Sequence, residues 1–189
     1  MSDARDAILR ASARCIARTG VRGLRVLDVA KQAGVSSGLL YYHFDDRDGL
    51  LAATLEYINA SALGYRARER AEASPTERLV AMLVDEVADD DDVRDESAAW
   101  NEIRAAAVFE PALGASLRNV TKAWEVDVAA AVREAQEADG VATSIDADEL
   151  APMLTTLVEG VSARWLSGQI DADRARTVLR SATQRLLRS

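Results

Sequence analysis

Hydrophobic residues recur every three to four positions along most of this 189-residue chain, which is the spacing of helices that bury one face. In residues 3–19 the members of that face are Ile8, Ser12, Cys15, Ile16 and Thr19. Gly20 follows and is suited to end the helix in a left-handed conformation. Strand-like alternation does not occur in the sequence. We therefore predict an all-α protein of about nine helices.

Two short helices are predicted after the first one, at residues 26–33 and 37–43. Gly34 accepts the positive φ that a tight turn between them requires, and Ser36 is a favourable N-cap for the second. Ala30 is a small residue at the predicted helix crossing, and Leu40 is an apolar residue that packs between the helices. Together they complete the pattern of a helix-turn-helix.

Capping signals indicate where the later helices begin. The expected starts are Asp45–Asp48, Ser74–Glu77, Glu110–Pro111, Asp146–Glu149 and Asp171, and a sixth helix is expected around Trp100, Ile103 and Ala107. Ser74 and Asp146 each precede a glutamate by three residues, which predicts a capping box at both sites. The four aspartates at residues 89–92 are predicted to form a solvated loop.

The charge of the chain is unevenly distributed. Its net charge is −8, yet residues 1–50 contain eight Lys/Arg and six Asp/Glu, whereas residues 51–189 contain fifteen and twenty-five. A mildly basic segment joined to an acidic one is typical of a phosphate-facing module fused to another domain. We expect a first domain at residues 1–50 and a second at residues 51–189.

The sequence offers little chemistry for catalysis. The single histidine, His43, and the single cysteine, Cys15, lie on different predicted helices, which argues against a Cys–His dyad or a zinc site. Glu-x-x-His pairs and a glycine-rich loop after a strand do not occur. We expect neither an enzyme nor a metal or cofactor site. A charged N-terminus and the lack of a long apolar run predict a cytoplasmic protein with no membrane contact.

The predicted helix at residues 37–43 has two distinct sides. If Leu40 and Phe44 face the core, Ser37, Gly38, Tyr41 and Tyr42 face outward. Small residues allow close approach to bases in the major groove, and tyrosine hydroxyls donate to phosphates. His43 has two interpretations, a packing residue at the helix end or a donor to phosphate or a base edge.

Residues 1–50 resemble the DNA-binding domain of the tetracycline-repressor (TetR) family of bacterial transcriptional regulators. The residues that carry the resemblance are Asp28-Val29-Ala30, Ala33-Gly34-Val35-Ser36, Gly38, Leu40-Tyr41-Tyr42-His43-Phe44 and Arg47. They cover about a quarter of the chain. The resemblance implies a repressor that binds an operator in double-stranded DNA as a homodimer and is released by a small-molecule effector.

The family pattern implies which residues contact DNA. Bases are implied to lie near Ser36, Ser37, Gly38 and Leu39, and phosphates or base edges near Tyr41, Tyr42 and His43; Arg25 and Arg47 are implied to reach the DNA backbone. Leu39 replaces a frequent small or hydroxyl residue, so its contact would be apolar, as with a thymine methyl group. Arg25 replaces a threonine that often caps the second helix, which leaves that cap in doubt.

The last two predicted helices resemble the dimerisation region of the family. They present apolar side chains at Leu154, Val158, Val161, Trp165, Val178, Leu179, Ala182 and Leu186. Two such pairs related by a two-fold axis would form an intersubunit four-helix bundle. An alternative is that part of this set packs within its own subunit.

The resemblance also implies an effector pocket in the second domain. The candidate lining residues are Trp100, Asn101, Arg104, Phe109, Trp124 and Glu159. Arg104 and Glu159 have opposite charges, so the sequence leaves the charge of the effector open. The alternative function is a TetR-like DNA-binding protein that answers to a protein partner, or acts as a nucleoid or division factor, without a small ligand.

Overall fold

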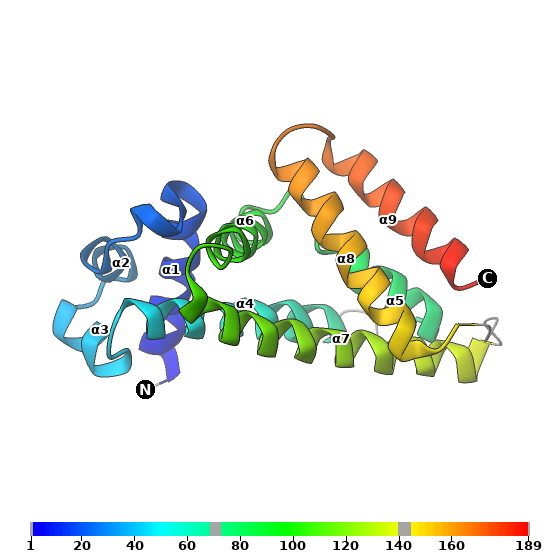
Figure 1. Cartoon of the computed structure of the whole chain (residues 1–189), viewed down its shortest axis with the longest axis horizontal. Coiled ribbons are helices and arrows are strands. Elements are labelled where there is room, and N and C mark those ends of the chain that lie inside the picture. Colours follow the sequence, from blue (N-terminus) through cyan, green and yellow to red (C-terminus); the bar gives the residue numbers. More distant parts are fainter. Residues whose placement is uncertain (1, 69–72, 140–144, 189) are drawn as a thin grey trace. The chain divides into compact units, whose positions relative to one another are not determined.

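The computed structural model describes residues 2–68, 73–139 and 145–188 and confirms the all-α class. Within these ranges there are nine helices and no strand (Figure 1). The helices are α1 (Ser2–Gly23), α2 (Val26–Ala33), α3 (Ser37–His43), α4 (Arg47–Arg68), α5 (Pro75–Val84), α6 (Asp91–Ala106), α7 (Pro111–Asp139), α8 (Ala147–Leu166) and α9 (Ala172–Leu186).

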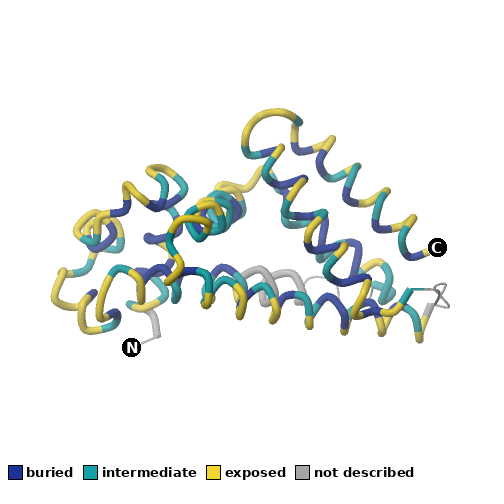
Figure 2. Tube along the Cα trace, viewed as in Figure 1, coloured by how far each residue is buried: buried dark blue, intermediate teal, exposed yellow. Residues whose placement is uncertain are grey.

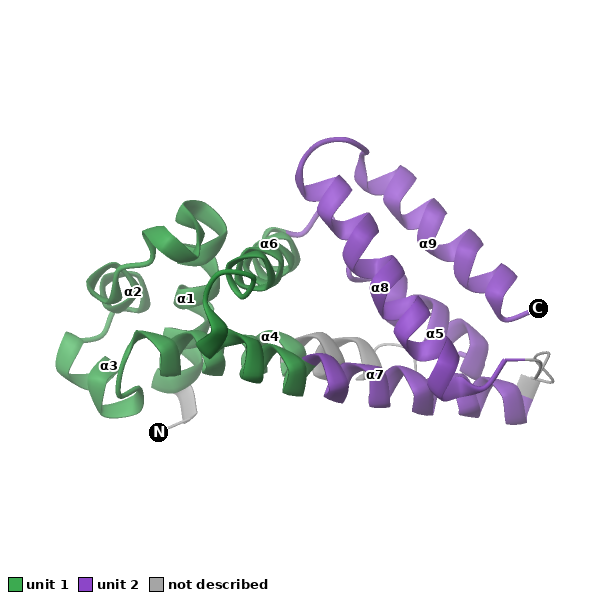
Figure 3. Ribbon diagram, in the orientation of Figure 1, with its two compact units in different colours: residues 1–61, 91–120 green, residues 62–90, 121–189 purple. Residues whose placement is uncertain are grey.

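The chain forms two compact units (Figure 3). Unit 1 contains Met1–Ser61 and Asp91–Val120, and unit 2 contains Ala62–Asp90 and Thr121–Ser189. Helices α4 and α7 each contribute to both units. Helix α6 belongs to unit 1, together with α1, α2 and α3, a grouping that the sequence pattern does not indicate.

Helix α1 is the centre of unit 1, because it packs against α6, α2 and α3. The core around it includes Ile8, Leu9, Ile16, Val29, Leu40, Leu50, Leu51, Leu55, Ala99 and Ile103, all of them buried. Each large apolar side chain removed from water contributes roughly 1.5–3 kcal/mol. The short helices α2 and α3 thus share one core with α1, α4 and α6.

Two polar clusters connect α1 to its neighbours in unit 1, one buried and one part-buried. The Thr54 hydroxyl of α4 lies 2.9 Å from Ser12 Oγ of α1 and 2.7 Å from the Leu50 carbonyl oxygen. The Cys15 thiol donates to Gln32 Oε1 at 3.2 Å, and burial raises the pKa of this thiol, which keeps it protonated as a donor. These contacts fix α1 against α4 and against α2.

In unit 2, α8 packs against α9, and α5 contacts both. Buried positions recur every three to four residues along α8 and α9 (Figure 2). Arg176 of α9 ties this group to the segment after α5, because its guanidinium donates to the Val87 carbonyl oxygen (3.4 Å) and to Asp89 (3.3 Å) and Asp173 (2.7 Å).

Several predicted boundaries are confirmed. Gly20 adopts φ 70°, although helical structure resumes and α1 extends to Gly23. The capping box at Ser74 is present, with the Ser74 backbone N–H donating to Glu77 and the Glu77 N–H donating to Ser74. Asp171 caps α9 by accepting from the Arg174 N–H at 2.7 Å.

Three local predictions are corrected. Asp91 and Asp92 form the first turn of α6 instead of a loop, because carboxylates are favourable at the positive end of a helix. Asp146 caps α8 by accepting from the Asp148 N–H at 2.7 Å rather than through a capping box with Glu149. Thr19 is exposed, and its hydroxyl donates to the Cys15 carbonyl oxygen instead of joining the core.

The buried contact between Ser12 and Thr54 gives a first prediction. Thr54→Val keeps the volume of the side chain but leaves the Ser12 hydroxyl buried without this partner. We expect the free energy of unfolding in urea to fall by about 1–3 kcal/mol. In the Ser12→Ala background the same substitution should be less destabilising, since no orphaned hydroxyl remains. Equal losses in both backgrounds would contradict the coupling.

Candidate nucleic-acid interface

The turn between α2 and α3 depends on Gly34. This residue adopts φ 69° and ψ 28°, in the left-handed region, and the next backbone N–H, that of Val35, donates to the Ala30 carbonyl oxygen at 3.0 Å. Ser36 then caps α3, because its Oγ accepts from the Leu39 N–H at 3.1 Å. The chain therefore turns from α2 into α3 within three residues, as the sequence predicts.

Helix α3 has seven residues, too few for a stable isolated helix. It is held by Leu40 and by Phe44, the residue that follows it, which are 1% and 5% exposed. The Arg5 guanidinium of α1 lies 5.6 Å from the centre of the Phe44 ring and adds a cation–π contact. Packing against α1 thus fixes the rotation of α3 about its own axis.

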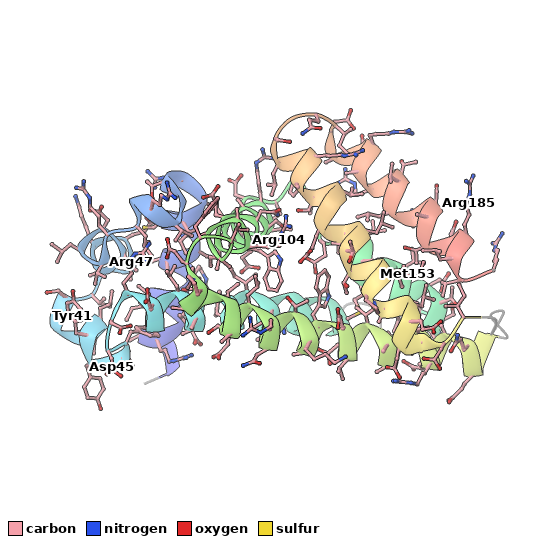
Figure 4. All side chains as sticks on the ribbon, in the orientation of Figure 1. Tyr41, Asp45, Arg47, Arg104, Met153 and Arg185 are labelled. Atoms are coloured by element: carbon pink, nitrogen blue, oxygen red, sulfur yellow. The ribbon has the colours of Figure 1, made fainter. Side chains whose placement is uncertain are left out.

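The opposite side of α3 is open to solvent. Ser36, Ser37 and Gly38 are exposed, and Leu39, Tyr41 and Tyr42 are 37%, 51% and 73% exposed. Tyr41 is labelled on α3 in Figure 4. The predicted orientation is confirmed, with small residues in the first half of the helix and two phenol hydroxyls in the second.

His43 lies between these two sides. It is half-buried, and its ring meets the Tyr42 ring edge-on, with 5.3 Å between the ring centres. This contact restrains the more exposed of the two tyrosines. A role for His43 as a donor to DNA stays a prediction.

Exposed cations surround the helix-turn-helix. Arg25 is the N-cap residue of α2, and its side chain makes no capping hydrogen bond. The cap that a threonine often makes at this position in the family is therefore absent. Arg18, Arg22, Arg25 and Lys31 are all exposed, and none of them forms an ion pair in the described part of the chain. Their charges are therefore available to an anionic surface.

Arg47 has partners within unit 1. Its Nη2 donates to the Val21 carbonyl oxygen at 2.6 Å, and its Nη1 lies 3.6 Å from Asp48 and 3.7 Å from Glu110 (Figure 4). These contacts join the end of α1, the start of α4 and the connection between α6 and α7. Sequence reasoning missed this arrangement, and the predicted contact of Arg47 with DNA stays a prediction.

The predicted effector residues are divided between the units. On α6, in unit 1, Trp100, Asn101 and Arg104 are half-buried. Phe109 lies in the connection after α6 and is 73% exposed, so within unit 1 it is not enclosed. In unit 2, Trp124 of α7 is buried and Glu159 of α8 is half-buried.

The predicted dimer residues require a correction. Leu154, Val158, Val161, Trp165 and Leu179 are buried in the single chain and are therefore core residues, as the alternative interpretation anticipated. Val178, Ala182 and Leu186 of α9 are only half-buried. A second, partly exposed stripe on α8 was missed; it contains Met153 and Leu157, and Met153 is 48% exposed (Figure 4).

Two family models together match most of this chain. The model described as BetI-type transcriptional repressor, C-terminal, matches residues 75–188, and the model described as bacterial regulatory proteins, tetR family, matches residues 8–54. This chain belongs to the TetR family of transcriptional regulators. The family consists of regulators and not of enzymes.

Individual relatives agree with this assignment. The HTH-type transcriptional regulator BetI of Cronobacter sakazakii is 32% identical over 116 residues, which span 58% of this chain and 56% of that protein, little more than half its length. A solved structure assigned as a TetR-family regulator from Rhodococcus sp. is 48% identical, with a TM-score of 0.93 and complete coverage of both chains. Another, assigned as a regulator from Saccharomonospora viridis and solved with choline, is 29% identical, with a TM-score of 0.77 and coverage of 96% of this chain and 95% of that one.

No cluster of three or more His, Cys, Asp or Glu residues suited to a metal ion occurs among the described residues. None of the described helices is both long and apolar enough to span a bilayer.

The left-handed turn between α2 and α3 gives the second prediction. A Cβ at Gly34 would meet no atom within 4 Å, so the effect of Gly34→Ala isolates backbone strain from steric clash. We expect the free energy of unfolding to fall by about 1–2 kcal/mol. Gly34→Asn is the matched control and should lose less, because asparagine tolerates this conformation. An alanine variant as stable as the wild type would contradict the assigned conformation.

Proposed function

We propose that this regulator is a cytoplasmic homodimeric repressor that binds a pseudo-palindromic operator and dissociates when a small molecule binds. The observation that carries the proposal is the exposed side of α3, where Ser37, Gly38, Tyr41 and Tyr42 face solvent while Leu40 and Phe44 are buried. A rigid helix that presents small residues and hydroxyls suits entry into the major groove.

The proposed contacts fall into two classes. Ser37, Gly38 and Leu39, near the start of α3, approach base edges, with Leu39 suited to a thymine methyl group. Tyr42, Arg25 and the exposed cations of α1 and α2 contact phosphates, which set register and affinity without reading sequence. In a two-fold dimer the half-sites lie roughly 34–36 Å apart, one turn of DNA.

The proposed dimer uses the sides of α8 and α9 that the single chain leaves partly open. Met153 and Leu157 on α8 and Val178, Ala182 and Leu186 on α9 supply apolar side chains that are not fully buried. Related by a two-fold axis, these stripes form a self-complementary contact. The buried residues Leu154, Val158 and Leu179 support it from within unit 2.

The effector step is supported by relatives. The match to a BetI-type C-terminal region covers residues 75–188, and the related regulator from S. viridis was solved with choline. Release requires that the effector bind more tightly to a conformation unsuited to the operator. If no small molecule alters operator affinity, control by a protein partner becomes the better proposal.

The DNA interface gives the third prediction, on Arg25. An operator is first selected from random duplexes with the full-length protein, and affinity is then measured by fluorescence anisotropy from low to high salt. Arg25→Gln should weaken binding to all sequences, and because each dimer loses two phosphate contacts, the slope of log K against log salt should become shallower by about 2. Arg180→Gln, an exposed arginine on α9, is the matched control and should change neither quantity.

A companion variant separates base reading from phosphate contact. Leu39→Ala should change which sequences are selected while leaving the salt slope unaltered, since it removes no charge. If Arg25→Gln changes sequence preference and Leu39→Ala changes only affinity, the two roles are reversed. If the wild type selects no sequence at all, the proposed function is wrong.

The dimer gives the fourth prediction. Val178→Glu places a charge in the proposed apolar contact, and we expect light scattering at micromolar concentration to shift from dimer to monomer. Gln184→Glu adds the same charge at an exposed position of α9 and should remain dimeric. A monomeric wild type would remove the dimer from the proposal, and a dimeric Val178→Glu variant would place the contact elsewhere.

A further inference from the structure

Three polar groups follow one another along one side of α6. The Asn101 side-chain amide donates to the Ser97 carbonyl oxygen at 3.0 Å, and its Oδ1 accepts from Arg104 Nη2 at 3.0 Å. The spacing of three to four residues places them on adjacent turns. Asn101 is thus anchored to the helix backbone and in turn holds the Arg104 guanidinium.

Arg104 is short of partners for a charged group. Its Nε is buried, and no group among the described residues accepts a hydrogen bond from it. Its Nη2 donates to the uncharged amide oxygen of Asn101, and no carboxylate pairs with it in the described part of the chain. A buried donor without an acceptor is destabilising, and more so when the group is charged.

Other half-buried arginines are satisfied differently. Arg47, Arg78 and Arg176 each donate to a backbone carbonyl oxygen and pair with at least one carboxylate. Within the described ranges, Arg104 has neither a backbone carbonyl partner nor a carboxylate partner. The same chain therefore neutralises half-buried guanidinium groups elsewhere and leaves this one unpaired.

The surroundings of Arg104 on α6 suit an organic ligand. Trp100, one turn earlier, packs its partly buried ring against the core of unit 1. An aromatic residue one helical turn from a guanidinium suits a molecule with an apolar body and an acidic end. Glu159, the candidate of opposite charge, already takes part in an interaction of its own.

We propose that the effector is an organic acid whose carboxylate accepts hydrogen bonds from the Arg104 guanidinium. This inference rests on the proposed function and adds the charge of the ligand to it. It also separates this protein from its relative solved with choline, because a quaternary ammonium group would be repelled by an unpaired guanidinium at this position.

The first test needs no ligand. If Arg104 is kept for an anion, Arg104→Met removes an uncompensated charge, and the Tm of the full-length protein without added ligand should rise by roughly 2–4 °C. Arg176→Met is the matched control and should lower the Tm, since that guanidinium has both carbonyl and carboxylate partners. A lower Tm for Arg104→Met would show a structural role and overturn the proposal.

The second test uses defined probes. Carboxylates from acetate to octanoate and benzoate are compared by thermal shift with their amides, with choline and with inorganic phosphate. Carboxylates should raise the Tm of the wild type but not of Arg104→Met, and the amides and choline should have no effect in either protein. Stabilisation by choline, by the amides, or by phosphate alone would overturn the proposal, as would the lack of any effect of the carboxylates.

Operator binding distinguishes this inference from the function on which it rests. A probe that stabilises the wild type should also release the selected operator, with a loss of operator affinity of at least tenfold. Arg104→Met should bind the operator with the affinity of the wild type, and the probe should not change that affinity. Stabilisation by a carboxylate in a protein that selects no operator would support the anion site and contradict the repressor. Release of the operator by choline that persists in Arg104→Met would support the repressor and contradict the anion site.

Discussion

The candidate nucleic-acid interface depends on one constraint, the burial of Leu40 and Phe44. A seven-residue helix has little stability of its own, so α3 exists because these two side chains enter the core formed around α1. Their spacing fixes the rotation of the helix and therefore decides which residues face solvent. Gly34 and Ser36 set the direction in which α3 leaves the turn. At the other end of α3, the Arg5 guanidinium lies over the Phe44 ring.

Local chemistry explains why so much of the fold is predictable from the sequence. The positive φ at Gly34, the cap at Ser36 and the capping box at Ser74 each depend on residues within a few positions of one another, and all three are present. The outward side of α3 follows from the same short-range logic, because two apolar residues four apart leave the rest of a short helix exposed.

Contacts between distant segments were not predictable in this way. Arg47 and Glu110 are far apart in sequence, and no spacing pattern connects them, so the inward orientation of Arg47 appears only in the structure. An apolar stripe likewise does not say which surface covers it. Leu154, Val158 and Leu179 read equally well as core or interface, and their burial within one chain decides for the core.

The electrostatics of unit 1 change once α6 is included. The two segments of unit 1, Met1–Ser61 and Asp91–Val120, together contain eleven Lys/Arg and thirteen Asp/Glu. The basic excess of residues 1–50 therefore does not extend to the whole of unit 1. Some of the acidic groups pair with cations away from α3, as Asp92 does with Arg14 at 2.6 Å. In the proposed complex, attraction to DNA would come from exposed cations such as Arg25 and Lys31 rather than from the net charge of unit 1, because screening limits each charge to about one Debye length, roughly 8–10 Å.

Helix α6 also offers a physical route within unit 1 from the proposed anion site to the candidate nucleic-acid interface. Ala99 and Ile103 on one side of it belong to the same core as Leu40 and Phe44. Arg104 occupies the neighbouring side, and Glu110, just beyond the helix, contacts Arg47. Interiors are close-packed, so a displacement of α6 by an anion at Arg104 would have to be accommodated by the residues that hold α3. The free energy available for release is then the difference in anion affinity between the two positions of α6.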